Sequence, residues 1–158
     1  VQWDMHFLRE ITADNRAVIE ALRVSAEQES YVDGVASSLR EAASRASSRP
    51  WCRAVYDGDV PVGFVMLADG APSGDPVIPW PYYLWRMLID ERHQSHGHGR
   101  AALDLVVAHL RGRPDAEVLV TSVVPGPGSP LGFYLAYGFE DTGEWWDHEL
   151  VIRLPLHR

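Results

Sequence analysis

The stretch from Gln94 to Arg100 has the residue types of an anion-binding loop. It follows an apolar segment and places Gly97 and Gly99 where a helix should begin. Glycine lets the backbone approach a ligand closely, and the first turn of a helix leaves N–H groups without intrahelical partners. Together with the positive end of the helix dipole, these N–H groups suit a pyrophosphate. The pattern predicts an anion site, although a helix start without a ligand could use the same glycines.

The same loop contains three histidines, His93, His96 and His98, within six residues. Such spacing raises the question of a metal site. A set of ligands drawn from one loop, with no nearby cysteine, fits zinc geometry poorly. We therefore expect no metal and interpret these side chains as polar residues that line the loop. Cys52 is the single cysteine, which excludes an internal disulfide.

A second segment, residues 132–139, is rich in aromatic residues and glycine. In combination with the loop, it resembles the GNAT superfamily of N-acetyltransferases. The superfamily's acetyl-CoA signature, Gln/Arg-x-x-Gly-x-Gly/Ala, is matched by Gln94, Gly97 and Gly99, and its later Tyr and Gly-Phe signature by Tyr134, Gly138 and Phe139. Segments outside these motifs, such as residues 62–66 and 86–90, are similar to bacterial spermine/spermidine N-acetyltransferases.

The resemblance implies that acetyl passes directly from acetyl-CoA to an amine in a ternary complex. Tyr134 would then be the general acid that protonates the departing thiolate, and its alternative role is that of a packed aromatic residue. The position where the superfamily often has a cofactor-contacting Asn holds Pro127. The implied cofactor-binding residues are Leu88 and Ile89 at the oxyanion, and Gln94, Ser95, His96, Gly97, His98, Gly99 and Arg100 around the pyrophosphate.

The charge composition points to the kind of acceptor. The chain has 22 acidic residues and 14 basic ones, for a net charge of −8, and all 14 are Arg. The absence of Lys excludes a Walker-type phosphate loop and a Schiff base, and the acidity argues against a nucleic-acid partner. A cationic partner fits better. The expected substrate-binding residues are Glu29, Asp33 and Trp85, and the general base is left open among Glu29, Asp33, Asp90 and His148.

These observations favour an N-acetyltransferase that acts on a small cationic amine, with a polyamine as the leading acceptor. One alternative is an acetyltransferase that modifies an antibiotic or another metabolite, and another is a non-catalytic acyl-CoA-binding sensor. No membrane span or signal-peptide pattern is visible, so a cytoplasmic location is expected. The oligomeric state is left open, and a homodimer is one alternative because dimers are common in the superfamily.

The element pattern predicts one α/β domain over residues 1–158, with a mixed, mostly antiparallel central sheet flanked by helices. The alternation and the helical spacing of apolar residues mark the individual segments. Strands are predicted at residues 5–12, 51–56, 60–67, 82–89 and 117–124, and in a closing hairpin at residues 139–154 that turns around residues 141–146. Helices are predicted at residues 15–25, 31–46 and 99–111, and in a short helix from a Ser129 cap to Gly138.

Overall fold

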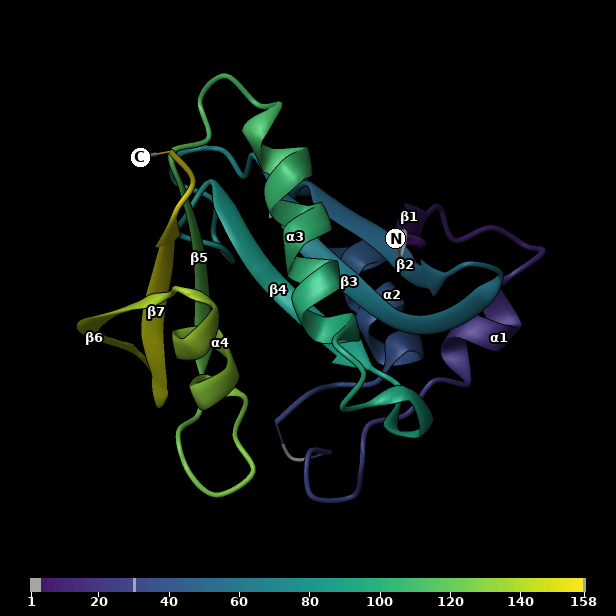
Figure 1. The fold of residues 1–158 in the computed structure, drawn as a ribbon. Coiled ribbons are helices and arrows are strands. Elements are labelled where there is room, and N and C mark those ends of the chain that lie inside the picture. Colours follow the sequence, from purple (N-terminus) through teal and green to yellow (C-terminus); the bar gives the residue numbers. More distant parts are fainter. Residues whose placement is uncertain (1–3, 30, 158) are drawn as a thin grey trace.

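The computed structural model describes residues 4–29 and 31–157, and it is a mixed α/β fold built on one sheet (Figure 1). The sheet has the order β1-β2-β3-β4-β5-β7-β6. Within the described ranges every pair of neighbouring strands is antiparallel except β4 and β5, which are parallel. The strands are β1 His6–Arg9, β2 Pro50–Asp57, β3 Val60–Asp69, β4 Tyr82–Ile89, β5 Val118–Val123, β6 Glu140–Trp146 and β7 Glu149–Pro155.

Helices cover both faces of this sheet, and each face has its own apolar core. α3 and α4 pack on one face, where α3 contributes the buried residues Leu103, Val106 and Leu110. α1 and α2 cover the other face, where Ile19 and Val35 are buried against β3 and β4 (Figure 1). The helices are α1 Arg16–Glu20, α2 Val35–Ser44, α3 His98–Arg111 and α4 Leu131–Tyr137, with 3-10 turns at Ala46–Ser48 and Glu91–His93.

The helix predicted at residues 15–25 is much shorter in the structure. It ends at Glu20, and residues 22–25 form no regular secondary structure, because the loop after β4 binds the backbone of Arg23. The N–H of Arg23 donates to Asp90 Oδ1 at 2.9 Å, and its carbonyl accepts from the N–H of Glu91. A contact 67 residues away along the chain thus outweighs the local helical pattern.

Three other predicted boundaries differ. The helix predicted from residue 31 begins at Val35, and the preceding residues form a loop beside the sheet. Pro130, not Ser129, occupies the N-cap of α4, and the Ser129 hydroxyl accepts from the N–H of Leu131. The predicted turn at residues 141–146 is wrong. These residues belong to β6, and the chain turns at Asp147, whose φ is +58°.

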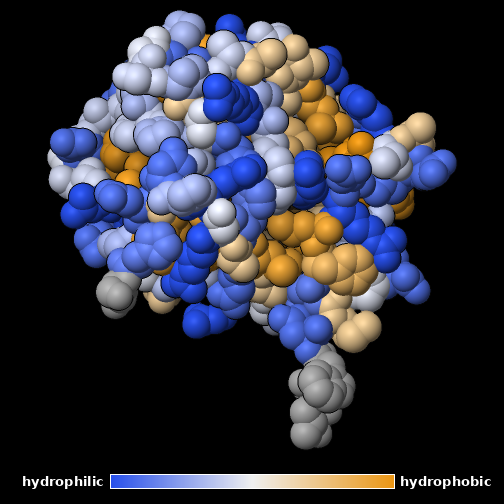
Figure 2. Space-filling view, turned by 90° about the horizontal axis from the view of Figure 1, so that it is seen from above, coloured by the Kyte–Doolittle hydropathy of each residue, from blue (hydrophilic) through white to orange (hydrophobic). Residues whose placement is uncertain are grey.

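Hydrophilic residues cover much of the molecule's upper end, with hydrophobic residues showing in areas between them (Figure 2). This end carries the last turn of α3 and the loops around it, and the loops that precede α3 and α4 lie at the opposite end (Figure 1). In the ranges described, no helix combines the length and the hydropathy that crossing a bilayer requires.

Candidate active site

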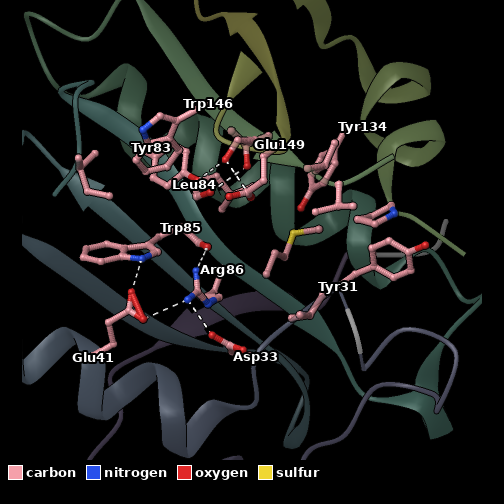
Figure 3. Close-up of a pocket in the computed structure, with 18 of the residues that line it drawn as sticks. Tyr31, Asp33, Glu41, Tyr83, Leu84, Trp85, Arg86, Tyr134, Trp146 and Glu149 are labelled. Atoms are coloured by element: carbon pink, nitrogen blue, oxygen red, sulfur yellow. Dashed lines mark hydrogen bonds and ion pairs between the residues drawn. The ribbon is translucent and has the colours of Figure 1, made fainter. Parts of the chain in front are cut away.

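Two adjoining cavities, of about 430 and 450 Å³, lie where β4 and β5 diverge. Residues of the loop before α3 line the first cavity, and residues of α2, β4, β5 and β7 line the second. Met87 and Tyr134 line both cavities, so they mark the place where the two spaces meet. We refer to the first as the loop cavity and to the second as the acidic cavity, which Figure 3 shows.

The divergence of the two central strands creates this space. β4 and β5 pair at Tyr83 and Val120, and the Thr121 hydroxyl donates to the carbonyl of Leu84 at 2.9 Å. A register shift between β3 and β4 makes Trp85 an extra residue in β4. Such a bulge bends a strand and increases its twist. Beyond it, β4 and β5 separate, which leaves the free edge of β4 facing the cavities (Figure 1).

Backbone alternation decides which N–H groups face the gap. The N–H of Asp90 donates to the carbonyl of Val62 on β3, and in an antiparallel pair the hydrogen-bonded residues alternate. The backbone of Leu88 therefore faces β3, whereas those of Met87 and Ile89 face the gap. Gln94 Nε2 donates to the carbonyl of Ile89 at 3.0 Å, which agrees with this orientation. Leu88, predicted to supply the oxyanion donor, lines neither cavity, and Met87 takes its place.

The loop before α3 has the conformation that an anion cradle requires. Gly97 is the N-cap of α3 with a φ of +79°, and Ser95 also has a positive φ, of +67°. A Cβ on Gly97 would meet no atom of the protein within 4 Å, so its role is conformational and leaves room for a ligand. A Cβ on Gly99 would lie 3.1 Å from Phe133 Cζ, so this glycine serves packing against α4.

Most of the predicted cofactor residues line the loop cavity together: Ile89, Gln94, Ser95, Gly97, His98, Gly99 and Arg100. His96 does not, because it points into a separate cavity with His6. Burial, followed by the nearby His6, lowers the pKa of His98, so its ring is neutral near neutral pH. The charged side chain available for an anion in this loop is therefore Arg100, together with the free N–H groups of the first turn of α3.

Tyr134 is buried on α4 at the junction of the two cavities, with 5% of its surface exposed. Its ring contacts Phe133 and Phe139 edge to face. Its hydroxyl forms no hydrogen bond with any residue the structure describes, and the side chain projects from α4 toward the cavity (Figure 3). Burial raises the pKa of Tyr134 above its usual value, so the phenol is protonated and can donate.

Carboxylates and aromatic rings form the wall of the acidic cavity (Figure 3). Arg86 Nη2 donates to Asp33 Oδ2 at 2.9 Å and to Glu41 Oε2 at 3.1 Å. Trp85 Nε1 donates to the other oxygen of Glu41 at 2.8 Å. The lining contains three carboxylates, those of Asp33, Glu41 and Glu149, and one guanidinium, that of Arg86. The cavity therefore has a net negative charge. Its aromatic lining residues are Tyr31, Tyr83, Trp85, Tyr134 and Trp146.

Glu149 differs from the other two carboxylates. Among the residues described, it forms no ion pair and accepts a hydrogen bond from Ser122 Oγ at 3.2 Å. Since Ser122 donates its proton to Glu149, the hydroxyl of Tyr83 is the donor in the 2.5 Å contact with Ser122 Oγ. Burial raises the pKa of Tyr83 to about 12, so this phenol keeps its proton. The hydroxyls of Tyr83 and Ser122 thus orient the carboxylate of Glu149. This carboxylate can still accept hydrogen bonds from a group in the cavity.

The model of the acetyltransferase (GNAT) family matches residues 7–139 of the sequence. The chain belongs to this family. It is an acetyl-transferring enzyme, as the sequence predicts, and the alternative of a non-catalytic sensor is set aside. Gln94, Gly97 and Gly99 of the first GNAT signature line the loop cavity, and so does Tyr134 of the second.

Individual relatives carry more specific names. A spermine/spermidine N(1)-acetyltransferase of Bacillus subtilis (strain 168) is 29% identical over 137 residues, which is 87% of this chain and 89% of the relative. Two solved structures share the fold at 14% identity. One is a spermidine N-acetyltransferase from Vibrio cholerae in complex with CoA and spermine (TM-score 0.67, 96% of each chain). The other is an aminoglycoside acetyltransferase in complex with coenzyme A (TM-score 0.74, 95% of this chain and 94% of that one).

Only some of the residues predicted to bind the acceptor line the same cavity of this GNAT enzyme. Asp33 and Trp85 line the acidic cavity, as does His148, one of the four candidate bases. Glu29 lines a smaller neighbouring cavity of about 230 Å³ that Asp33 also borders. Asp90 is 1% exposed and holds the backbone of Arg23 and the side chain of Arg92, so its role is structural.

Sequence reasoning missed Glu41, Arg86 and Met87 as site residues. Glu41 left a weak signal, because it lies three residues after the buried Ser38 on the inner face of α2. A carboxylate at that spacing is unusual on a buried helical stripe. Arg86 also left a signal, because a lone charge is unusual in a segment that predicts a central strand with apolar residues on both faces.

Proposed function

We propose that this enzyme transfers acetyl from acetyl-CoA to a primary amine of a small cationic acceptor, and that a polyamine is the preferred acceptor. The observation that carries this proposal is the acidic cavity that meets the loop cavity at Tyr134. Its carboxylates attract an ammonium group, and its tryptophan and tyrosine rings can contact a cation or an alkyl chain. The name of the Bacillus subtilis relative, which is 29% identical, supports this acceptor.

The loop cavity supports acetyl-CoA as the donor. It combines the free N–H groups of the first turn of α3, the open space at Gly97 and the guanidinium of Arg100. These groups would hold the pyrophosphate. When bound, acetyl-CoA supplies the thioester whose carbonyl carbon the amine attacks. The N–H groups of Met87 and Ile89 at the free edge of β4 would stabilise negative charge on the carbonyl oxygen.

Tyr134 and Glu149 take the two proton-linked roles. As the C–N bond forms and the C–S bond breaks, Tyr134 donates its proton to the departing sulfur. The attacking amine must first lose a proton, because an alkylammonium has a pKa near 10. Glu149 binds the ammonium and accepts this proton directly or through water, since it is the cavity carboxylate without an ion-pair partner among the residues described. This scheme requires residues of one chain only.

An acceptor panel tests the proposed function. Initial rates with acetyl-CoA should be highest for spermidine, spermine and related diamines, and lower for aminoglycosides and for amino acids whose carboxylate opposes the acidic lining. Release of CoA can be followed with a thiol reagent. Turnover of an aminoglycoside without turnover of any polyamine would overturn the polyamine proposal and favour the antibiotic-modifying alternative.

The Glu149→Gln variant should raise the KM for spermidine by about tenfold, which corresponds to the loss of one hydrogen bond to a charged group. The KM for acetyl-CoA should not change, because Glu149 lines only the acidic cavity of the two. Steady-state kinetics with each substrate varied in turn separates the two effects. Glu144→Gln is the matched control, since it removes the same charge from an exposed site on the same hairpin. If both variants raised the KM for spermidine equally, Glu149 would not bind the ammonium directly and would contribute only to the overall negative charge of the protein.

A further inference from the structure

A third cavity, of about 530 Å³, adjoins the loop cavity and gathers most of the histidines of the chain. It is formed where the start of β1 and the end of β2 meet the beginning of α3. His93 and His98 line both this cavity and the loop cavity. The remaining lining residues of the third cavity are Asp4, Met5, His6, Asp57 and His96.

Three of these side chains converge on one point. His6, Asp57 and His98 each offer a ligand atom, and these atoms lie within 4.8 Å of one another. His6 Nε2 and His98 Nδ1 are 2.6 Å apart, although the two residues are separated by 92 positions. His98 is 7% exposed, so the meeting point is shielded from water on one side. The sequence could not reveal this convergence, because His6 and Asp57 come from other strands.

The hydrogen bonds of His6 fix which of its nitrogens is free. Asp4 is exposed, and an exposed carboxylate is ionised at neutral pH, so it can only accept. His6 Nδ1, 2.6 Å from Asp4 Oδ1, is therefore the donor. In the neutral ring the lone pair of Nε2 then points at His98 Nδ1. A carboxylate that holds one ring nitrogen while the other faces a shared point is the usual support of a metal-bound histidine.

We propose that His6 Nε2, His98 Nδ1 and the Asp57 carboxylate bind one Zn²⁺ ion, with Asp4 orienting His6. Two imidazoles, one carboxylate and an open fourth position form a common zinc ligand set. Ligands at about 2.0–2.1 Å from a tetrahedral zinc lie roughly 3.3 Å apart, so small side-chain rotations around the present positions accommodate the ion. The fourth ligand is a water molecule or one of the histidines His93 and His96. Their rings lie about 6 Å from the ring of His98.

Such an ion would tie three elements together beside the loop cavity. His98 is the first residue of α3 and directly follows Gly97. Holding His98 to β1 and to the end of β2 fixes the beginning of the helix whose N–H groups form the anion cradle. The zinc site would thus stabilise the fold, and its metal takes no part in acetyl transfer.

Zinc binding to untagged protein without CoA tests the proposal directly. Isothermal titration with ZnCl₂ should give one strong site, and thermal melting should shift upward with added zinc. Co²⁺ should produce the visible absorption of a tetrahedral complex. His6→Ala should abolish this site, and Asp4→Asn should weaken it by about 10–100-fold, the usual effect of removing the partner of a metal-bound histidine.

Controls separate a specific site from loose association with histidines. His157→Ala and Asp59→Asn remove a histidine and a carboxylate outside the cluster and should leave the zinc titration unchanged. Circular dichroism of each variant without metal checks folding, and Asp57→Asn provides a second ligand variant at the end of β2. Zinc binding that persists unchanged in His6→Ala and Asp57→Asn, or absence of binding in the wild type, would overturn the proposal and leave the contact as a His–His hydrogen bond.

Discussion

Replacing Tyr134 with Phe should lower the kcat of acetyl transfer by about 10²–10³-fold and leave the affinity for CoA nearly unchanged. The substitution removes the buried hydroxyl at the junction of the two cavities, which has no hydrogen bond to the residues described. It keeps the ring that packs against Phe133 and Phe139. Steady-state kinetics gives kcat, and calorimetry with CoA gives the affinity.

Tyr137→Phe is the matched control for this experiment. Tyr137 lies one turn further along α4, lines neither cavity, and donates its hydroxyl proton to Asp104 Oδ1 at 2.7 Å. Its replacement should lower stability slightly and leave kcat within about twofold of the wild type, because it removes only one exposed hydrogen bond. If Tyr134→Phe retained full kcat, Tyr134 would be a packing residue and the proton would have to come from water.

Replacing Gly97 with Val should weaken CoA binding by at least about tenfold. A β-branched residue strongly disfavours the φ of +79° that Gly97 adopts, and a left-handed conformation costs about 1–2 kcal/mol for a residue with a Cβ. No protein atom lies within 4 Å of the added Cβ, so the new side chain extends into the space proposed for the pyrophosphate. Calorimetry with CoA measures the loss.

Gly74→Val is the control that distinguishes a loss of CoA binding at the loop from a general effect of backbone strain. Gly74 has almost the same φ, +80°, and the same open surroundings, but it lies in the loop between β3 and β4 and lines neither cavity. Both variants should melt at similarly reduced temperatures, and only Gly97→Val should lose CoA affinity. Unaltered CoA affinity in Gly97→Val would place the cofactor elsewhere.

The sequence predicts the scaffold well where local pattern and tertiary environment agree. The strand at residues 82–89 is apolar on both faces and appears with those bounds, because a central strand is buried on both sides. The helix at residues 15–25 is overestimated, because Asp90 and Glu91 bind the backbone of Arg23. The turn is predicted too early in the chain, because Asp141 and Gly143 have turn-forming residue types but lie at an irregularity within β6.

By itself, the sequence determines the family and the loop with Gly97 at the start of a helix, and it predicts Tyr134 as a site residue. These features are local, since a positive φ or a signature motif can be recognised within a few residues. Only the tertiary structure decides which β4 backbone groups face the gap, that Arg86 holds Asp33 and Glu41, and that His6 meets His98. These features depend on strand register and on contacts between distant segments, and a one-residue shift in register reverses the direction of every backbone and side-chain group.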